Sequence, residues 1–173
     1  GIENTSIKKR KISNMKKILL VSLLLVLSLL EAGEGDVLFG AGRYGEAREL
    51  YEGMLKGELS LSQKFLVRVN IGSILLASGK YSEALDYFSV VVIPEDPAPH
   101  GLRGKYLGEA MSLFNRSLSR FNEEEEVIDD LLQAQLLLEK AEKVDIELAE
   151  LEGREQIAEI IILVRKNVKF LLV

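Results

Sequence analysis

From residue 33 to the end of this 173-residue chain, apolar residues recur three or four positions apart, which is the period of an amphipathic helix. No stretch shows the sustained alternation of apolar and polar residues that indicates a half-buried strand. Glycine and proline interrupt the helical pattern and divide it into seven segments. The sequence therefore predicts an all-α protein, with helices over residues 34–41, 44–56, 62–78, 82–92, 101–120, 123–143 and 154–171.

Residues that start and stop helices agree with these ranges. Ser60 or Ser62 can cap the third helix, because a serine hydroxyl accepts a hydrogen bond from the first helical amides. Asn122, followed three residues later by Glu125, has the spacing of a capping box at the start of the sixth helix. Three prolines make residues 93–99 a linker that no regular helix crosses.

Two parts of the pattern are near copies of each other. Residues 42–47 (Gly-Arg-Tyr-Gly-Glu-Ala) are followed thirty-seven positions later by residues 79–84 (Gly-Lys-Tyr-Ser-Glu-Ala), and each copy leads to an aromatic residue, Tyr51 or Phe88. A period in this range indicates stacked helical pairs. Each pair must bury its apolar face against the next, and the stack leaves an extended concave surface.

These motifs resemble the tetratricopeptide repeat (TPR), a family of antiparallel helix pairs about 34 residues long. The second pair, over residues 62–92, matches best, and the first pair matches in its second helix. In the first helix of the first pair, Gly33 and Gly35 interrupt the pattern. The matching residues are Gly42, Tyr44, Ala47, Tyr51 and Leu55 in the first pair, and Asn70, Ile71, Gly72, Leu75, Gly79, Tyr81, Ala84 and Phe88 in the second.

A third pair is degenerate. Tyr106-Leu107-Gly108 with Met111 suits its first helix, and Ala134, Leu138, Ala141 and Asp145 then have the spacing of a second helix and its closing turn. The two parts are separated by an insertion over roughly 115–130. The resemblance implies a right-handed superhelix of about three pairs over 34–145, with 154–171 as a capping helix or the first half of a further pair.

In the TPR family the first helix of each pair lines the concave groove. The resemblance therefore implies a peptide-binding groove, since apolar surface with a few polar groups suits an extended or helical peptide. Its residues would be Leu66, Val69, Asn70, Ser73 and Leu76 of the second pair, and Leu102, Lys105, Tyr106, Glu109 and Leu113 of the third. The alternative is that several of these side chains pack against the last helix or the insertion.

Some members of that family hold a terminal carboxylate with basic and asparagine side chains. Here only Asn70 and Lys105 occupy such groove positions, with Arg68 and Arg103 nearby. The pattern is incomplete, so a carboxylate clamp is not expected.

The N-terminal part of the chain has the layout of a secretory signal peptide. Met15-Lys16-Lys17 precedes an apolar run over residues 18–30 that only two serines interrupt. As a helix this run spans about 20 Å, less than the roughly 30 Å of a bilayer core. We expect residues 1–33 to be an upstream segment plus signal peptide, with a true start at Met15, and residues 34–173 to be the folded domain.

Two alternatives remain for this N-terminal part. An uncleaved signal-anchor would tether the protein to a membrane through residues 18–30, since no good cleavage site follows the run. Alternatively, residues 8–11 (Lys-Lys-Arg-Lys) would serve as a nuclear address or nucleic-acid arm. The apolar run next to them favours export, so we expect a periplasmic or cell-envelope protein.

Charge and composition narrow the function further. The net charge is −5, but the first thirty residues hold six basic side chains and one acidic one, so the remainder carries about −10. Such a body repels nucleic acid and anionic lipid. The absence of cysteine excludes disulfides and thiol catalysis, and His100 is the only histidine, expected in an exposed loop.

The remaining chemistry-bearing features are weak. The acidic residues of 123–130 could chelate a hard cation, but an acidic run at a helix start is more often solvated and stabilised by the helix dipole. We expect no metal, no cofactor and no enzymatic activity. The sequence indicates an adaptor or scaffold that binds a protein or peptide partner. The alternative is a self-associating structural protein that uses the apolar face of residues 157–171.

Overall fold

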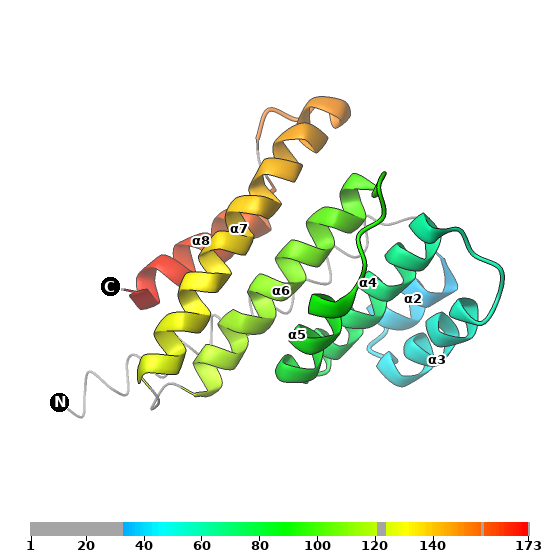
Figure 1. Ribbon diagram of the computed structural model, residues 1–173, viewed down its shortest axis with the longest axis horizontal. Helices are drawn as coiled ribbons and strands as arrows, with labels where there is room; N and C mark the ends of the chain where they lie inside the picture. The colour runs from blue at the N-terminus through cyan, green and yellow to red at the C-terminus, as the bar shows by residue number, and fades with distance from the viewer. Residues whose placement is uncertain (1–32, 121–123, 157, 173) are drawn as a thin grey trace.

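The computed structural model describes residues 33–120, 124–156 and 158–172, without the side chains of 124–126. In this part of the chain every regular element is a helix, as the sequence predicts (Figure 1). The seven helices are α2 (Glu34–Gly40), α3 (Tyr44–Leu55), α4 (Leu61–Ala77), α5 (Tyr81–Val90), α6 (Pro99–Ser119), α7 (Glu124–Glu152) and α8 (Glu159–Leu172).

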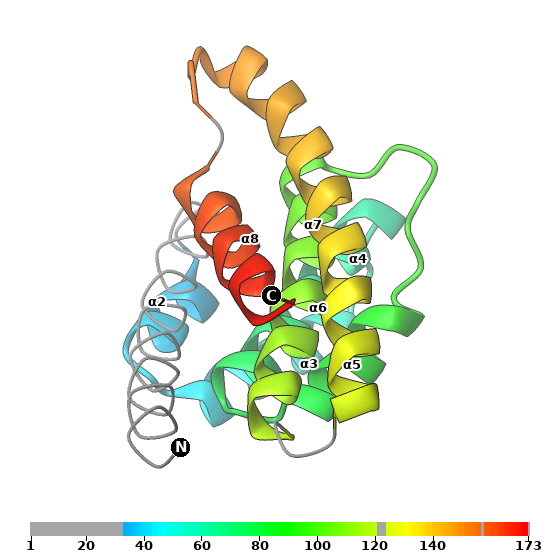
Figure 2. The same ribbon diagram turned by 90° about the vertical axis from the view of Figure 1, so that its left-hand side faces the viewer.

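Each helix packs against the next one in the chain, so the order in space follows the order in sequence (Figure 1). Helix α6 lies at the centre, because it also contacts α4 and α8. Figure 2 shows α8 lying alongside α6 and α7, and Figure 1 shows α7 and α8 at the end of the molecule away from α3. Among the described helices, α6 and α7 make the most extensive contact, and together they form a hairpin.

Three glycines end helices in the left-handed conformation. Gly42, Gly79 and Gly153 have φ values of 75°, 77° and 66°. This conformation costs glycine little free energy because glycine has no Cβ. After each of them, the next amide donates back to a carbonyl five residues earlier, at 2.9, 3.0 and 2.8 Å. The repeated motifs at 42–47 and 79–84 thus begin with the same turn between two helices.

Another set of glycines lets helices approach closely. A Cβ at Gly72 or at Gly108 would lie within 3.0 Å of the Phe88 ring, so the backbones of α4 and α6 approach the same ring. Phe88 is fully buried between them. Gly35 stands in the same relation to Tyr51. The expectation that Gly35 interrupts the first helix is therefore wrong, since it belongs to α2 and makes room for the ring.

The predicted boundaries of α2 to α6 are correct to within two residues, and the local reasons are visible. Ser60, not Ser62, caps α4: its hydroxyl accepts from the Gln63 amide at 3.1 Å, and the Gln63 side chain accepts from the Ser60 amide at 2.9 Å. Pro99 begins α6 instead of ending the linker, which suits a residue without an amide hydrogen. The predicted cap at Asn122 lies outside the described residues.

The third pair differs most from its prediction. The expected insertion over 115–130 contains no separate element among the described residues, because α6 continues to Ser119 and α7 begins at Glu124. The expected closing turn at Asp145 is wrong, since α7 continues to Glu152 and ends at Gly153. Helix α8 accordingly begins five residues later than predicted. The predicted packing positions of α7 are all buried: Ala134, Leu138 and Ala141.

Within the described residues no helix is long and apolar enough to cross a membrane. The apolar run over 18–30, with the signal peptide or anchor expected there, lies outside the described residues.

The two kinds of glycine predict opposite effects of adding one methyl group. Gly108→Ala should destabilise the protein by about 1–3 kcal/mol, because the Phe88 ring is enclosed and cannot move away freely. Gly53→Ala should stabilise it by about 0.5–1 kcal/mol, because Gly53 lies inside α3 and has open space at its Cβ position. Urea unfolding of both variants measures the difference. Equal effects of the two substitutions would contradict the close approach of α6 to Phe88.

Candidate functional site

A cavity of about 680 Å³ opens between α2, α3, α4 and the start of α6. Its wall is mainly apolar, with polar groups at a few positions. The lining residues are Gly33, Glu34, Gly35, Asp36, Leu50, Tyr51, Met54, Leu59, Gln63, Leu66, Val67, Asn70, Ala98 and His100. Its size lies within the range of about 300–1,000 Å³ that is usual for ligand pockets.

The cavity exists because α2 is short. Helices α2 and α4 end at the same kind of glycine turn, but α2 has 7 residues and α4 has 17. Helix α2 therefore covers only the first part of α3, and the end of α3 and the start of α4 lack a described neighbour on this side. Met54 of α3 is 43% exposed as a result, while Leu50, Leu59 and Leu66 are half-buried.

One strip of the cavity wall is polar. The Tyr51 hydroxyl donates to Asp36 Oδ1 at 2.8 Å and also interacts with the Asn70 side chain, so α2, α3 and α4 each contribute one group. Burial raises the pKa of the Tyr51 hydroxyl well above its ordinary value, and the hydrogen bond to Asp36 raises that pKa further. The hydroxyl therefore stays protonated and remains a donor to the carboxylate.

The structure divides the predicted groove residues into three groups. Leu66 and Asn70 line the cavity, and Leu102 and Tyr106 are half-buried elsewhere. The other six are buried: Val69, Ser73, Leu76, Lys105, Glu109 and Leu113. Val69, for example, lies against the backbone of Gly104 in α6. These six side chains are enclosed by packing between helices. Val69 packs against α6, and not against the last helix or the insertion named in the alternative above.

The residues considered for a carboxylate clamp do not converge on one point. Asn70 lies at the cavity, whereas Lys105 forms a buried ion pair with Glu109 one turn further along α6. Arg103 is likewise engaged with Asp145 at 2.5 Å. Because both cations already have carboxylate partners, neither is available to hold the carboxylate of a ligand.

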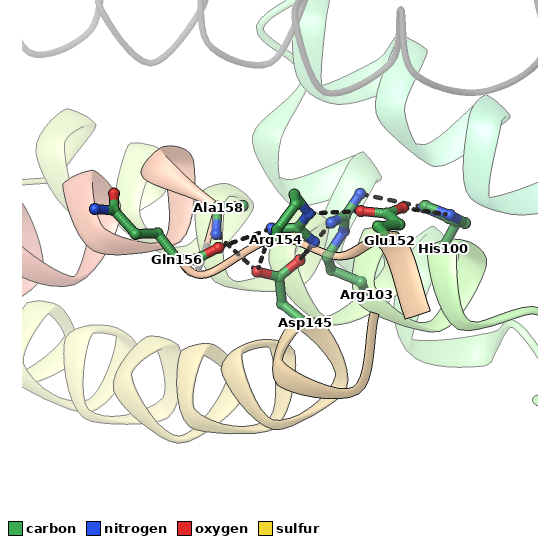
Figure 3. A network of polar contacts seen from close by, with 7 residues as sticks. All are labelled: His100, Arg103, Asp145, Glu152, Arg154, Gln156 and Ala158. Carbon is green, nitrogen blue, oxygen red and sulfur yellow. Dashed lines mark hydrogen bonds and ion pairs between the residues drawn. The ribbon is translucent and has the colours of Figure 1, made fainter. Parts of the chain in front are cut away.

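A second polar centre ties α8 to the rest of the molecule (Figure 3). Asp145, fully buried in α7, accepts from Arg103 of α6 at 2.5 Å and from Arg154 after α7 at 3.0 Å. It also accepts from the backbone amide of Ala158, just before α8, at 2.7 Å. Burial alone would raise the pKa of Asp145, but the bonds from Arg154, Ala158 and Arg103 outweigh it and lower that pKa.

His100 joins this centre at its edge. Its Nε2 lies 3.1 Å from Glu152, and its Nδ1 lies 3.3 Å from Arg103 (Figure 3). The expected exposed loop position is wrong, because His100 belongs to the first turn of α6 and contacts the end of α7. Asp145 holds the α7–α8 connection through charged hydrogen bonds, so this centre is a structural clamp.

The described residues contain no cluster of three or more histidine, aspartate or glutamate side chains that could hold a metal ion. Residues 121–123, and the side chains of 124–126, lie outside what the structure describes. Asp130, the last acid of the predicted cluster, is held by Arg116 through two bonds of 2.7 and 2.9 Å. It therefore serves the α6–α7 contact.

Most of the cavity lies outside the groove predicted from the sequence. Tyr51 and Met54 of α3 and Leu59 of the α3–α4 loop line it, although a groove inferred from the first helices alone excludes these segments. The register of the two repeats was a signal for it. When the shared turns are aligned, Gly33 and Gly35 correspond to Asn70 and Gly72, which lie inside α4 and not at its start. The position of Gly33 therefore indicated a first helix shorter than α4.

Asp145→Asn should lower the free energy of unfolding at pH 7 by about 3–5 kcal/mol, because it leaves the buried Arg103 without its counter-ion. Glu139→Gln, exposed on the same helix, is the matched control and should change it by less than about 0.5 kcal/mol. The native carboxylate contributes stability above its unfolded pKa, and this is lost as pH falls through its lowered folded pKa. The difference in unfolding free energy between the parent and Asp145→Asn should therefore become smaller below about pH 4. A difference independent of pH would contradict the assignment.

No family model, curated protein or solved structure matches the chain.

Proposed function

We propose that this chain is a TPR-like adaptor or scaffold that binds a segment of a protein partner in the cavity between α2, α3, α4 and α6. The proposal includes the superhelical arrangement implied by the resemblance, with pairs α2–α3, α4–α5 and α6–α7 and α8 as a cap. It is supported by the matching turns at Gly42 and Gly79, and by the equivalent close approaches at Gly35 and Gly72.

The cavity is the observation that carries this function. An apolar side chain of a partner that covers Leu50, Met54 or Leu66 gains about 25 cal/mol per Å² of apolar surface removed from water. The polar strip of Asp36 and Asn70 supplies hydrogen-bonding groups that can fix the backbone of a peptide. The expected partner segment is therefore apolar, with a donor group directed towards Asp36.

Two further features complete the proposal. The acidic body disfavours nucleic acid as the partner, because like charges repel. The basic and apolar residues over 15–30 support an exported protein of the periplasm or cell envelope. A mainly apolar wall suits the binding of a segment better than it suits proton transfer, which supports an adaptor over an enzyme.

Met54→Glu should weaken partner binding at least tenfold, because it places a charge on the apolar wall without disturbing buried packing. The probe is a set of peptides selected from a random display library on the full chain, and their affinities are measured by calorimetry. Val90→Glu is the matched control, since Val90 is 75% exposed and lies outside the cavity. Failure to select any peptide, or equal affinities for both variants, would overturn the proposed site.

The second candidate function is self-association, for which the structure suggests a different surface. The apolar face of α8 is largely used internally, because Ile160, Ile161, Val164 and Val168 are buried; Ile157 lies outside the described residues. Helix α7 instead exposes a stripe of Ile128, Leu132 and Leu136, which are 50%, 48% and 60% exposed and one helical turn apart.

If this stripe joins two copies, Leu132→Glu should convert a dimer into a monomer in sedimentation velocity at micromolar concentration, because it places two like charges at the contact. Glu139→Gln, on the same helix, should leave the dimer intact. A parent chain that sediments as a monomer would exclude self-association.

A further inference from the structure

The formal charges that line the cavity are negative. Glu34 and Asp36 of α2 face it, whereas no lysine or arginine among the described residues does. Neither carboxylate forms an ion pair with any described cation. His100 also lines the cavity, but its ring nitrogens already lie 3.1 Å from Glu152 and 3.3 Å from Arg103. The apolar cavity therefore carries negative charge that the surrounding side chains do not balance.

The Asp36 carboxylate is held in place by neutral groups. Its Oδ1 accepts from the Tyr51 hydroxyl at 2.8 Å, and its Oδ2 accepts from the Gly33 amide at 3.2 Å. These two donors orient the carboxylate without cancelling its charge. Each carboxylate oxygen can accept two hydrogen bonds, so both oxygens can take a further donor. A cationic donor suits them best, because a charge-assisted hydrogen bond is roughly twice as strong as a neutral one.

The apolar wall begins one helical turn from this carboxylate. Tyr51, which bonds to Asp36, and Met54 both line the cavity from α3. Residues three apart in a helix have Cβ atoms about 5–6 Å apart. An extended peptide covers this distance in two residues, because it rises about 3.3 Å per residue. One short segment can therefore place a cation at Asp36 and an apolar side chain on Met54 together.

The charge of the whole domain has the same sign as the cavity. After the first thirty residues the chain carries 16 basic and 26 acidic side chains, a balance of about −10. A surface of one sign raises the local concentration of oppositely charged partners and speeds their encounter. A segment that carries carboxylates is repelled both by this surface and by Glu34 and Asp36.

We propose that the cavity binds a basic and apolar segment of a protein partner. A lysine or arginine of the segment pairs with Asp36, and an apolar side chain within four residues of it packs on Met54 and Leu66. Glu34, exposed at the rim, adds to the attraction. This inference rests on the proposed function and narrows it, because the adaptor function by itself does not require a charged partner.

One substitution on each side of the contact tests the ion pair. Peptides are selected on the full chain from a random display library and then synthesised with an acetylated N-terminus, so that only a side chain supplies the cation. We expect them to share a lysine or arginine within four positions of an apolar residue. Replacing that cation by glutamine should lower the affinity for the parent at least tenfold in calorimetry. The same replacement should lower the affinity for Asp36→Asn at most threefold, because the carboxylate is already gone.

Glu49→Gln is the matched control for this variant. It removes one negative charge from α3, but Glu49 is exposed and does not line the cavity. Replacing the peptide cation should therefore cost Glu49→Gln as much affinity as it costs the parent. Circular dichroism checks that Asp36→Asn folds. Equal losses for the parent and Asp36→Asn, or binding that acetylation abolishes, would overturn the pairing of a basic side chain with Asp36.

A charge of either sign at Met54 gives a second test that leaves Asp36 intact. Both Met54→Glu and Met54→Lys place a charge on the apolar wall, so each should weaken binding. Met54→Lys should weaken it at least threefold more than Met54→Glu does, because the new cation repels the cation of the peptide about one helical turn away. Equal affinities for the two variants would contradict a basic segment.

These measurements separate this inference from the proposed function. If peptides are selected whose binding depends on Met54 but which share no basic residue, the adaptor function stands and the basic segment fails. If no peptide is selected, the proposed function fails, and this inference fails with it.

Discussion

The arrangement of helices depends on one close contact, in which the Phe88 ring of α5 lies between glycines of α4 and α6. At Gly72 and Gly108 the backbone itself touches the ring, and any larger residue would have to displace it. Because buried rings are held on all sides, this contact sets how closely three helices approach. The packing of the neighbouring core residues depends on this spacing, because α6 contacts helices on both sides of it.

The same contact, repeated with a polar ring, produces the candidate site. Tyr51 stands opposite Gly35 as Phe88 stands opposite Gly72, but its hydroxyl reaches the end of the ring and bonds to Asp36. The packing position that closes the core in the second pair therefore places a polar strip on a cavity wall in the first. A short α2 leaves that wall open, so Tyr51 both packs the first helix pair and lines the cavity.

The opposite end of the molecule is organised by charge. Asp145 accepts hydrogen bonds from Arg103 of α6 and from Arg154 and the Ala158 amide of the α7–α8 connection, and these bonds hold the connection in place. Such a buried carboxylate is stabilising only when its partners are all present, because its desolvation is costly. The position of α8, and hence the covered face of α6 and α7, depends on this clamp.

The candidate site was only partly predictable. Leu66 and Asn70 were identified because they occupy the groove positions of a repeat, and both line the cavity. Met54 and Leu59 were not identified, because they are exposed only where α2 is too short to cover them. The residue types at these positions do not indicate this. Val69 and Leu113 were assigned to the groove, but the approach of α6 to α4 buries the first and the core encloses the second.

The sequence by itself determined the helical period, the turns at Gly42 and Gly79 and a serine cap at the start of α4, because each of these acts within about five residues of the chain. Tertiary structure decided the rest. The pairing of Arg103 with Asp145 across forty-two residues and the cavity both depend on which segments meet in space. Local patterns specify where a helix begins and ends, whereas burial and ion pairing are set by neighbours that are distant in sequence.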